Sequence, residues 1–167
     1  MNEKSLGELV AVYVGDAGDV VDRILTNHTS GNVEGSALRK AVSEALGYRL
    51  ARKKRPSGSI KVRIDLPNPR EGENKVSAYI RSGMWRYVIC PSYDEAHDFQ
   101  WFVIDKLKPV LNRLHKTWNP RNLKRYRFLL AQLENAPLLL HDQLRGEPTG
   151  PGVYVLHHRD PKLLSAR

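Results

Sequence analysis

The period of the hydrophobic pattern changes along the chain, and the changes predict a mixture of strands and helices. Residues 8–15, ELVAVYVG, are apolar and rich in β-branched side chains, which predicts a buried strand. Residues 59–66, SIKVRIDL, alternate between polar and apolar positions and predict a half-exposed strand. Residues 67–74 are typical of a loop, and residues 75–92 favour a β-hairpin that turns after position 82.

Other segments have apolar positions at helical spacing. Asp19 is a candidate cap for a helix that carries apolar residues along one side, and residues 36–47 predict a second helix. Residues 92–109 predict a helix that Pro109 stops. Residues 119–135 begin with an Asn-Pro pair and predict a helix with one basic and one apolar face.

These elements predict an α+β fold, in which a small antiparallel or mixed sheet is flanked by helices. A length of 167 residues and ordinary globular composition, 41% hydrophobic and 27% charged, indicate a single domain over 1–167. We expect a basic β-hairpin insertion within 48–82 and a basic helical extension over 119–145. A last strand, at 150–160, follows a Gly/Pro-rich turn and looks like the beginning of a domain, although it lies near the end of the chain.

The net charge of +9 is concentrated in two blocks that contain no acidic residue. Residues 49–63 hold seven basic side chains and residues 106–127 hold eight. Solvated basic faces would explain one such block, but two in a small domain favour binding to the phosphates of nucleic acid.

Several classes of protein are disfavoured by the sequence. No apolar run approaches the roughly 20 residues that span a bilayer, and the first residues lack the pattern of a signal peptide, so we expect a cytoplasmic protein with no membrane partner. Cys90 is the lone cysteine, which excludes an internal disulfide and any zinc site built from several cysteines.

Tyr13 and Arg23 are the first candidates for chemistry. They stand ten positions apart, on a predicted strand and on the helix after it, across a turn that contains glycine. A phenol and a guanidinium held in this way can face one phosphate, the first acting on a water molecule and the second neutralising charge on the oxygens. Taken alone, such a pair is more often a packed aromatic ring and a surface charge.

Two segments resemble the GIY-YIG nuclease family. VAVYVGDAGDVVDRILTNH is similar to the family's Tyr-Val/Ile-Gly strand and the helix after it, with Arg23 and, five positions later, His28 where many members carry a histidine. DFQWFVIDKLKPVLN resembles the closing helix, in which an acidic residue is followed after nine positions by proline and after twelve by asparagine. That spacing assigns Gln100 to the position of the metal-binding glutamate, with Pro109 and Asn112 after it.

The family's Gly-Ile/Val-Tyr strand is absent from the start of the chain. Gly152, Val153 and Tyr154 match it at the other end, which indicates that the order of the domain is circularly permuted. Near and exposed termini make such a rearrangement tolerable. Two alternatives stay open: a strand swapped between two molecules, and the opening of a second, truncated nuclease domain.

The resemblance implies hydrolysis of DNA phosphodiesters with one divalent metal ion, Mg²⁺ or Mn²⁺. It implies that Tyr154 and Tyr13 line the site and that one of them helps to activate the attacking water. It further implies that Arg23 stabilises the transition state, that Asn112 supports the local structure and that Gly15 allows a close backbone approach.

Gln100 departs from the family pattern. A carboxamide offers a neutral oxygen where a carboxylate would offer charge to a hard dication, so we expect weak metal binding and a nearly inactive chain. The amide is either an engineered replacement or a natural loss of activity. Asp16 is a second departure, because related repair enzymes often carry lysine three positions after the second tyrosine. Its carboxylate is expected either to repel the phosphate or to reach a metal-bound water.

We expect the basic insertion to contact duplex DNA, which favours a sequence-specific, restriction-type endonuclease that cuts as a homodimer or by successive nicks. A repair or recombination nuclease that recognises DNA shape, and a catalytically inactive DNA-binding module, are the alternatives. The predicted DNA-binding residues are Arg39, Arg52, Lys53, Lys54, Arg55, Lys61, Arg63, Lys116 and Lys124.

Overall fold

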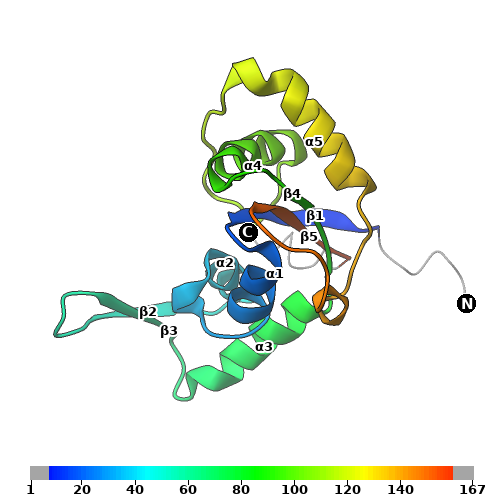
Figure 1. Ribbon diagram of the computed structural model, residues 1–167. Helices are drawn as coiled ribbons and strands as arrows, with labels where there is room; N and C mark the ends of the chain where they lie inside the picture. The colour runs from blue at the N-terminus through cyan, green and yellow to red at the C-terminus, as the bar shows by residue number, and fades with distance from the viewer. Residues whose placement is uncertain (1–7, 160–167) are drawn as a thin grey trace, which may run out of the picture.

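The computed structural model describes residues 8–159, and its centre is a three-stranded antiparallel sheet (Figure 1). The strands are β1 (Val10–Ala17), β4 (Met84–Ile89) and β5 (Gly152–His158), in the order β1-β5-β4. The last strand of the chain therefore pairs along both of its edges, with β1 on one side and β4 on the other.

The alternation of side chains along β5 divides the interior into two cores. Tyr154 and Leu156 point to one face of the sheet, and Val153 and Val155 point to the other. All four side chains are at most 1% exposed. A central strand covered on both faces is expected to read as a continuous apolar run, as this one does.

The first core lies between the sheet and the elements that follow β1. A helix begins after the Asp19 cap, whose side chain accepts from the Asp22 amide, and continues from α1 (Val20–Asp22) into the π-helical turn η2 (Arg23–His28). The short turn η3 (Val33–Gly35), α2 (Ala37–Ala45) and α3 (Pro69–Arg81) complete this layer (Figure 1).

The second core lies beneath α4 (Tyr93–Leu107) and α5 (Leu123–Asn135). The N-cap of α4 is Ser92, and the helix ends where Lys108 adopts a left-handed conformation just before Pro109. The turn η4 (Pro120–Asn122) leads into α5, and η5 (His141–Leu144) precedes the final strand. Both predicted helices are confirmed, and no helix within residues 8–159 is long and apolar enough to cross a membrane.

The prediction of a loop over 67–74 and a hairpin over 75–92 was wrong in its first half. Residues 69–81 form α3, which begins after Asn68 accepts a hydrogen bond from the Arg70 amide and has proline in its first turn. The buried positions Val76, Tyr79 and Ile80 are three and four apart, which is the spacing of a helix and not of a strand. Only the second half of the predicted hairpin, β4, is a strand.

The basic hairpin consists instead of β2 (Leu50–Lys54) and β3 (Ile60–Ile64), which form a separate two-stranded sheet. Figure 1 shows it projecting away from the body of the molecule. The predicted insertion over 48–82 therefore divides into this projecting hairpin and α3, which packs against α2 in the first core. The α+β class predicted from the sequence is confirmed.

Candidate active site

The tyrosines of the two family motifs lie on neighbouring strands. In the register of β1 and β5, Gly15 stands opposite Tyr154, and the Tyr13 and Tyr154 rings are 6.5 Å apart. A Cβ atom on Gly15 would overlap the Tyr154 hydroxyl group, and one on Gly152 would overlap the Val88 carbonyl oxygen of β4. Both glycines are therefore required by close packing.

The Tyr154 hydroxyl belongs to a buried chain of hydrogen bonds. Its oxygen lies 2.5 Å from His28 Nε2, and His28 Nδ1 lies 2.6 Å from the Ser36 hydroxyl. Ser36 is also the N-cap of α2, where it accepts a hydrogen bond from the Arg39 amide. His28 and Tyr154 are almost wholly buried, and Trp85 stacks against the His28 ring. The sequence singled out His28 and Tyr154 but missed Ser36, which looks like an ordinary helix cap.

Burial sets the protonation states of His28, Tyr154 and Tyr13. Burial, with smaller contributions from Arg23 and Arg39, lowers the pKa of His28 to about 3, so the imidazole is neutral near pH 7. Burial raises the pKa of Tyr154 well above its ordinary value, and the Tyr13 hydroxyl and Asp16 act in the same direction while Arg23 opposes them. Burial also raises the pKa of Tyr13 to about 12. Both phenols therefore hold their protons in the resting site.

Arg23 is a cation that acts on both Tyr13 and Tyr154. It is half-buried at the start of η2 and lowers the pKa of both Tyr13 and Tyr154, so its positive charge acts on both hydroxyl groups. It also lines an open cleft with Asp16, Asn27 and Tyr93. The structure thus brings Tyr13, Arg23, His28 and Tyr154 together.

Gln100 lies on α4 at the edge of the same site. Its side chain is nearly buried, and its amide nitrogen donates to the Asp16 carboxylate at 2.7 Å. The same carboxylate oxygen lies 2.7 Å from His97 Nδ1. From the sequence, the Asp16 carboxylate was expected either to repel the phosphate or to reach a metal-bound water. His97 was missed, although it precedes Gln100 by one helical turn and must share its face.

Asn112 holds the free edge of β1. Its side-chain oxygen accepts from the Val14 amide and its side-chain nitrogen donates to the Val14 carbonyl, both at 2.9 Å, and the Leu111 amide bonds to the Val12 carbonyl. The amide side chain therefore takes the place of a neighbouring strand beside Gly15.

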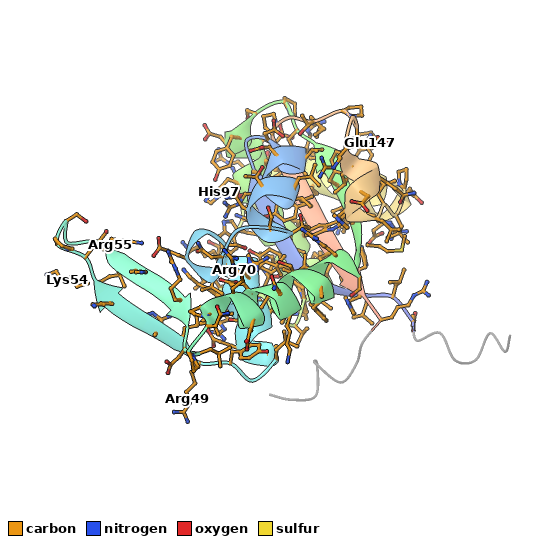
Figure 2. All side chains as sticks on the ribbon, turned by 90° about the horizontal axis from the view of Figure 1, so that it is seen from below. Arg49, Lys54, Arg55, Arg70, His97 and Glu147 are labelled. Carbon is orange, nitrogen blue, oxygen red and sulfur yellow. The ribbon has the colours of Figure 1, made fainter. Side chains whose placement is uncertain are left out.

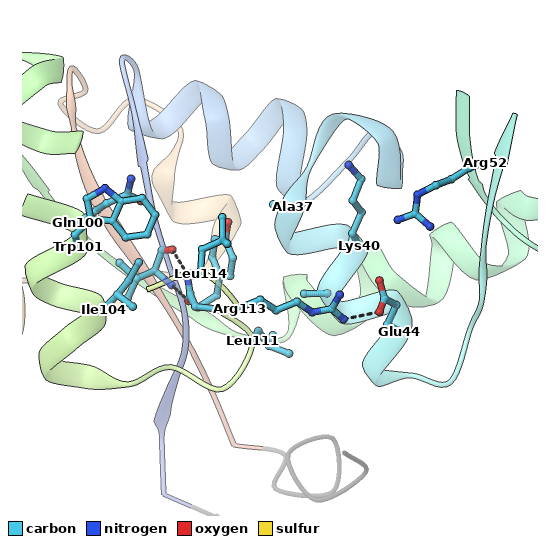
Figure 3. Close-up of a pocket in the computed structure, with 14 residues that line it drawn as sticks. Ala37, Lys40, Glu44, Arg52, Gln100, Trp101, Ile104, Leu111, Arg113 and Leu114 are labelled. Atoms are coloured by element: carbon cyan, nitrogen blue, oxygen red, sulfur yellow. Dashed lines mark hydrogen bonds and ion pairs between the residues drawn. The ribbon is translucent and has the colours of Figure 1, made fainter. Parts of the chain in front are cut away.

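A pocket of about 290 Å³ connects this site to the basic hairpin (Figure 3). Gln100 lies at one end and Arg52 of β2 at the other (Figure 3), and Tyr13 also lines the pocket. Arg113 and Glu44, which form an ion pair, also line the pocket (Figure 3). Tyr13 and Gln100 thus line the same pocket as Arg52 of the hairpin, while Arg23 faces the other cleft.

Arg39 does not lie on the protein surface, and its prediction as a DNA-binding residue was wrong. Its side chain is 0% exposed, pairs with Glu73 at 3.0 Å and donates to the His28 carbonyl and the Ser77 hydroxyl. Arginine satisfies several buried acceptors at once, so here it joins α2, α3 and η2.

The other predicted DNA-binding residues divide into two groups. Arg55 donates to both carboxylate oxygens of Glu34, and Arg63 lies 3.4 Å from one of them, which ties the hairpin to η3. The remaining ones are exposed, and Figure 2 shows the hairpin extending outward with Lys54 and Arg55 labelled. The exposed group comprises Arg52, Lys53, Lys54 and Lys61 on the hairpin, Lys116 in the loop before α5, and Lys124 on α5.

Within residues 8–159, no group of three or more histidine, cysteine, aspartate and glutamate side chains is arranged to hold a metal ion. Gln100 alone does not suit a hard dication, since it contributes one neutral oxygen. The adjacent Asp16 supplies the nearest charged oxygen.

Comparison with known proteins identifies the family. No curated protein and no solved structure matches the chain. The GIY-YIG catalytic domain matches residues 2–132, most of the chain. The match includes β1, the helix with Arg23 and His28, the hairpin, and α4 with Gln100. The chain therefore belongs to the GIY-YIG catalytic domain family, whose members are nucleases that generally depend on a divalent metal ion.

Proposed function

We propose that this protein is an endonuclease that hydrolyses phosphodiester bonds in duplex DNA with a single Mg²⁺ or Mn²⁺ ion. The observation that carries the proposal is the 2.5 Å hydrogen bond between the Tyr154 hydroxyl and a neutral, buried His28. A purely structural tyrosine and histidine need not meet beside an arginine and an open cleft.

The Tyr154–His28 pair is suited to removing a proton from the attacking water. In the tautomer with hydrogen on Nδ1, His28 donates to Ser36 and leaves Nε2 free to accept the Tyr154 proton. As water attacks phosphorus, Tyr154 takes a proton from it and passes its own to His28. A bound phosphodiester next to Arg23 brings negative charge that offsets part of the cationic field on His28.

Arg23 is placed to stabilise charge that develops on the phosphate oxygens. The guanidinium offers several donors to those oxygens, and the metal ion, when bound, acts as a Lewis acid on the same group. Because Gln100 brings a neutral oxygen to the metal position, we expect weaker metal binding and slower cleavage than in a form with glutamate there. Tyr13 orients water or phosphate from the adjacent strand.

The β2–β3 hairpin supports binding to duplex DNA. A two-stranded ribbon fits the major groove, and this ribbon presents exposed Arg52, Lys53, Lys54 and Lys61. Base contacts from such a ribbon favour a sequence-specific, restriction-type enzyme. Selection from randomised duplexes tests this, since a shape-reading repair nuclease would return no consensus sequence.

We also propose that residues 1–167 form one circularly permuted domain. The position of β5 between β1 and β4 of its own chain supports this over a strand swap, and β5 lies outside the residues that the family match covers. A rearranged chain that starts at Gly146, with the original termini joined by a flexible linker, is expected to fold as a monomer. Light scattering and circular dichroism test this, and a wild-type dimer that dissociates only with loss of β5 pairing would favour the swap.

Plasmid cleavage tests the activity. The wild-type protein, Gln100→Glu and Gln100→Glu/Tyr154→Phe are incubated with supercoiled plasmid and Mg²⁺ or Mn²⁺. We expect Gln100→Glu to cut faster than the wild type, because a carboxylate binds the metal ion more tightly, and the added Tyr154→Phe change to suppress cutting. Tyr13→Phe in the same background measures how much the Tyr13 hydroxyl group contributes to cleavage. If all of these proteins bind DNA but none cuts it, the inactive DNA-binding module replaces the proposal.

A further inference from the structure

Three polar side chains converge on one point beside the proposed catalytic tyrosines. Asp16 Oδ2 lies 2.7 Å from Gln100 Nε2 and 2.7 Å from His97 Nδ1, and those two nitrogens are 3.2 Å apart. His97 and Gln100 come from one face of α4, and Asp16 comes from β1. Side chains from two rigid elements thus meet at a single carboxylate oxygen.

The charge of Asp16 conflicts with binding of a phosphodiester. Its negative charge acts on both Tyr13 and Tyr154, so it lies at the catalytic centre. Its side chain is only 13% exposed, which limits screening by water. A phosphate arriving at Arg23 therefore meets an anion unless a cation lies between them.

We propose that Asp16, His97 and Gln100 bind a divalent cation, preferentially Mn²⁺, and that Asp16 supplies the negative charge that an amide at position 100 lacks. The inference rests on the proposed nuclease function. It places the charged ligand on β1, whereas the resemblance to the family's closing helix implies a charged ligand at position 100, on α4.

The donor atoms suit Mn²⁺ better than Mg²⁺. Gln100 turns its amide nitrogen toward Asp16, and a half-turn about its last bond presents the amide oxygen in the same place. The set then comprises one carboxylate oxygen, one amide oxygen and one imidazole nitrogen. Mg²⁺ strongly prefers oxygen, while Mn²⁺ accepts the mixed set, and water or phosphate oxygens fill the remaining positions.

Electron paramagnetic resonance of the full chain tests the site, with Mn²⁺ alone as the probe. We expect one Mn²⁺ per chain to lose its free-ion signal, at least tenfold weaker binding in Asp16→Asn, and a change below twofold in Asp94→Asn, a matched charge removal on the exposed part of α4. Spin-echo modulation from a nitrogen ligand should be present in the wild type and lost in His97→Gln. Thermal melts check that each variant is folded.

Two outcomes overturn the site: no Mn²⁺ binding by the folded wild type at millimolar concentration, or unchanged binding in folded Asp16→Asn. The function is judged separately by plasmid cleavage. Mn²⁺ binding through Asp16, with no cleavage by either the wild type or Gln100→Glu, would leave the site standing and remove the nuclease proposal. Cleavage with unchanged Mn²⁺ binding in Asp16→Asn would do the reverse.

Discussion

The buried Tyr154 centre and the projecting β2–β3 hairpin differ in whether their polar groups find partners within the protein. At the centre, Tyr154, His28 and Ser36 form a closed sequence of hydrogen bonds, packed between strands and helices. On the hairpin, Lys53 stands directly opposite Lys61, both are exposed, and their like charges repel. The polar groups of the first region are hydrogen-bonded to neighbouring residues of the protein. The positive charge of the second region is left to be balanced by an external anion.

This difference means that a substitution has a different kind of effect in each region. At the centre, removing one polar atom breaks a hydrogen bond of the Tyr154–His28–Ser36 series, which no other residue can replace. On the hairpin, each basic side chain is expected to add a separate and salt-sensitive contribution to the proposed DNA binding.

The largest expected effect is at the centre. Tyr154→Phe in the Gln100→Glu background removes the hydroxyl group but keeps the ring, and we expect cleavage to fall about 10³-fold because the general base is lost. Single-turnover cleavage at saturating protein measures this. An equal loss of DNA affinity with unchanged single-turnover rate would place Tyr154 in binding and not in chemistry.

The second-largest expected effect is on stability, at the buried Arg39. Arg39→Ala removes the ion-pair partner of the buried Glu73 carboxylate, which within residues 8–159 keeps only the Val33 amide, so we expect the free energy of unfolding to fall by about 3 kcal/mol or more. Urea denaturation measures it, with Lys53→Ala as the exposed comparison. Weaker DNA binding at unchanged stability would contradict the interior role.

The third effect is a dependence of stability on pH. His28 has a pKa of about 3 in the folded protein against 6.5 when exposed, so the unfolded chain binds the extra proton between these values. Stability is therefore retained above pH 6.5 and lost as pH falls toward 3, by about 1.4 kcal/mol per pH unit from this group.

His157, with a pKa lowered to about 4 mainly by burial, contributes in the same direction. His28→Gln should flatten the slope of unfolding free energy against pH between 6 and 4, and His157→Gln should flatten it over a narrower window. Urea titrations across this range measure both. A slope that His28→Gln leaves unchanged would show that His28 is not buried and neutral.

The smallest effect is on the hairpin. Lys53→Ala/Lys61→Ala removes the facing like charges, so we expect unchanged or slightly higher stability but about tenfold weaker DNA binding. The slope of log affinity against log salt should fall by about 2, one for each lost phosphate contact. Fluorescence anisotropy at several salt concentrations measures this, and Lys75→Ala, on the exposed side of α3, serves as the control. An unchanged salt slope would exclude the hairpin from the interface.

Sequence reasoning was accurate where a local pattern was strong and failed where two patterns competed. The helix with Gln100 has a clear cap, a helical period and a terminating proline, and all are present in the structure. Residues 69–81 contain a strand-like Val-Ser-Ala-Tyr-Ile run, yet their buried positions follow a helical period, and packing against α2 decides in favour of the helix. Arg39 appeared as another basic residue because burial cannot be read from composition.

The sequence by itself determined the family, the α+β class and the motif residues, because these depend on residue types at short, regular spacings. Only the tertiary structure decided that β5 lies at the centre of the sheet and that Ser36 supports His28. It alone brought Asp16 to His97 and Gln100. Those relations join residues far apart in the chain, and they follow from strand register and helix packing, which no local pattern encodes.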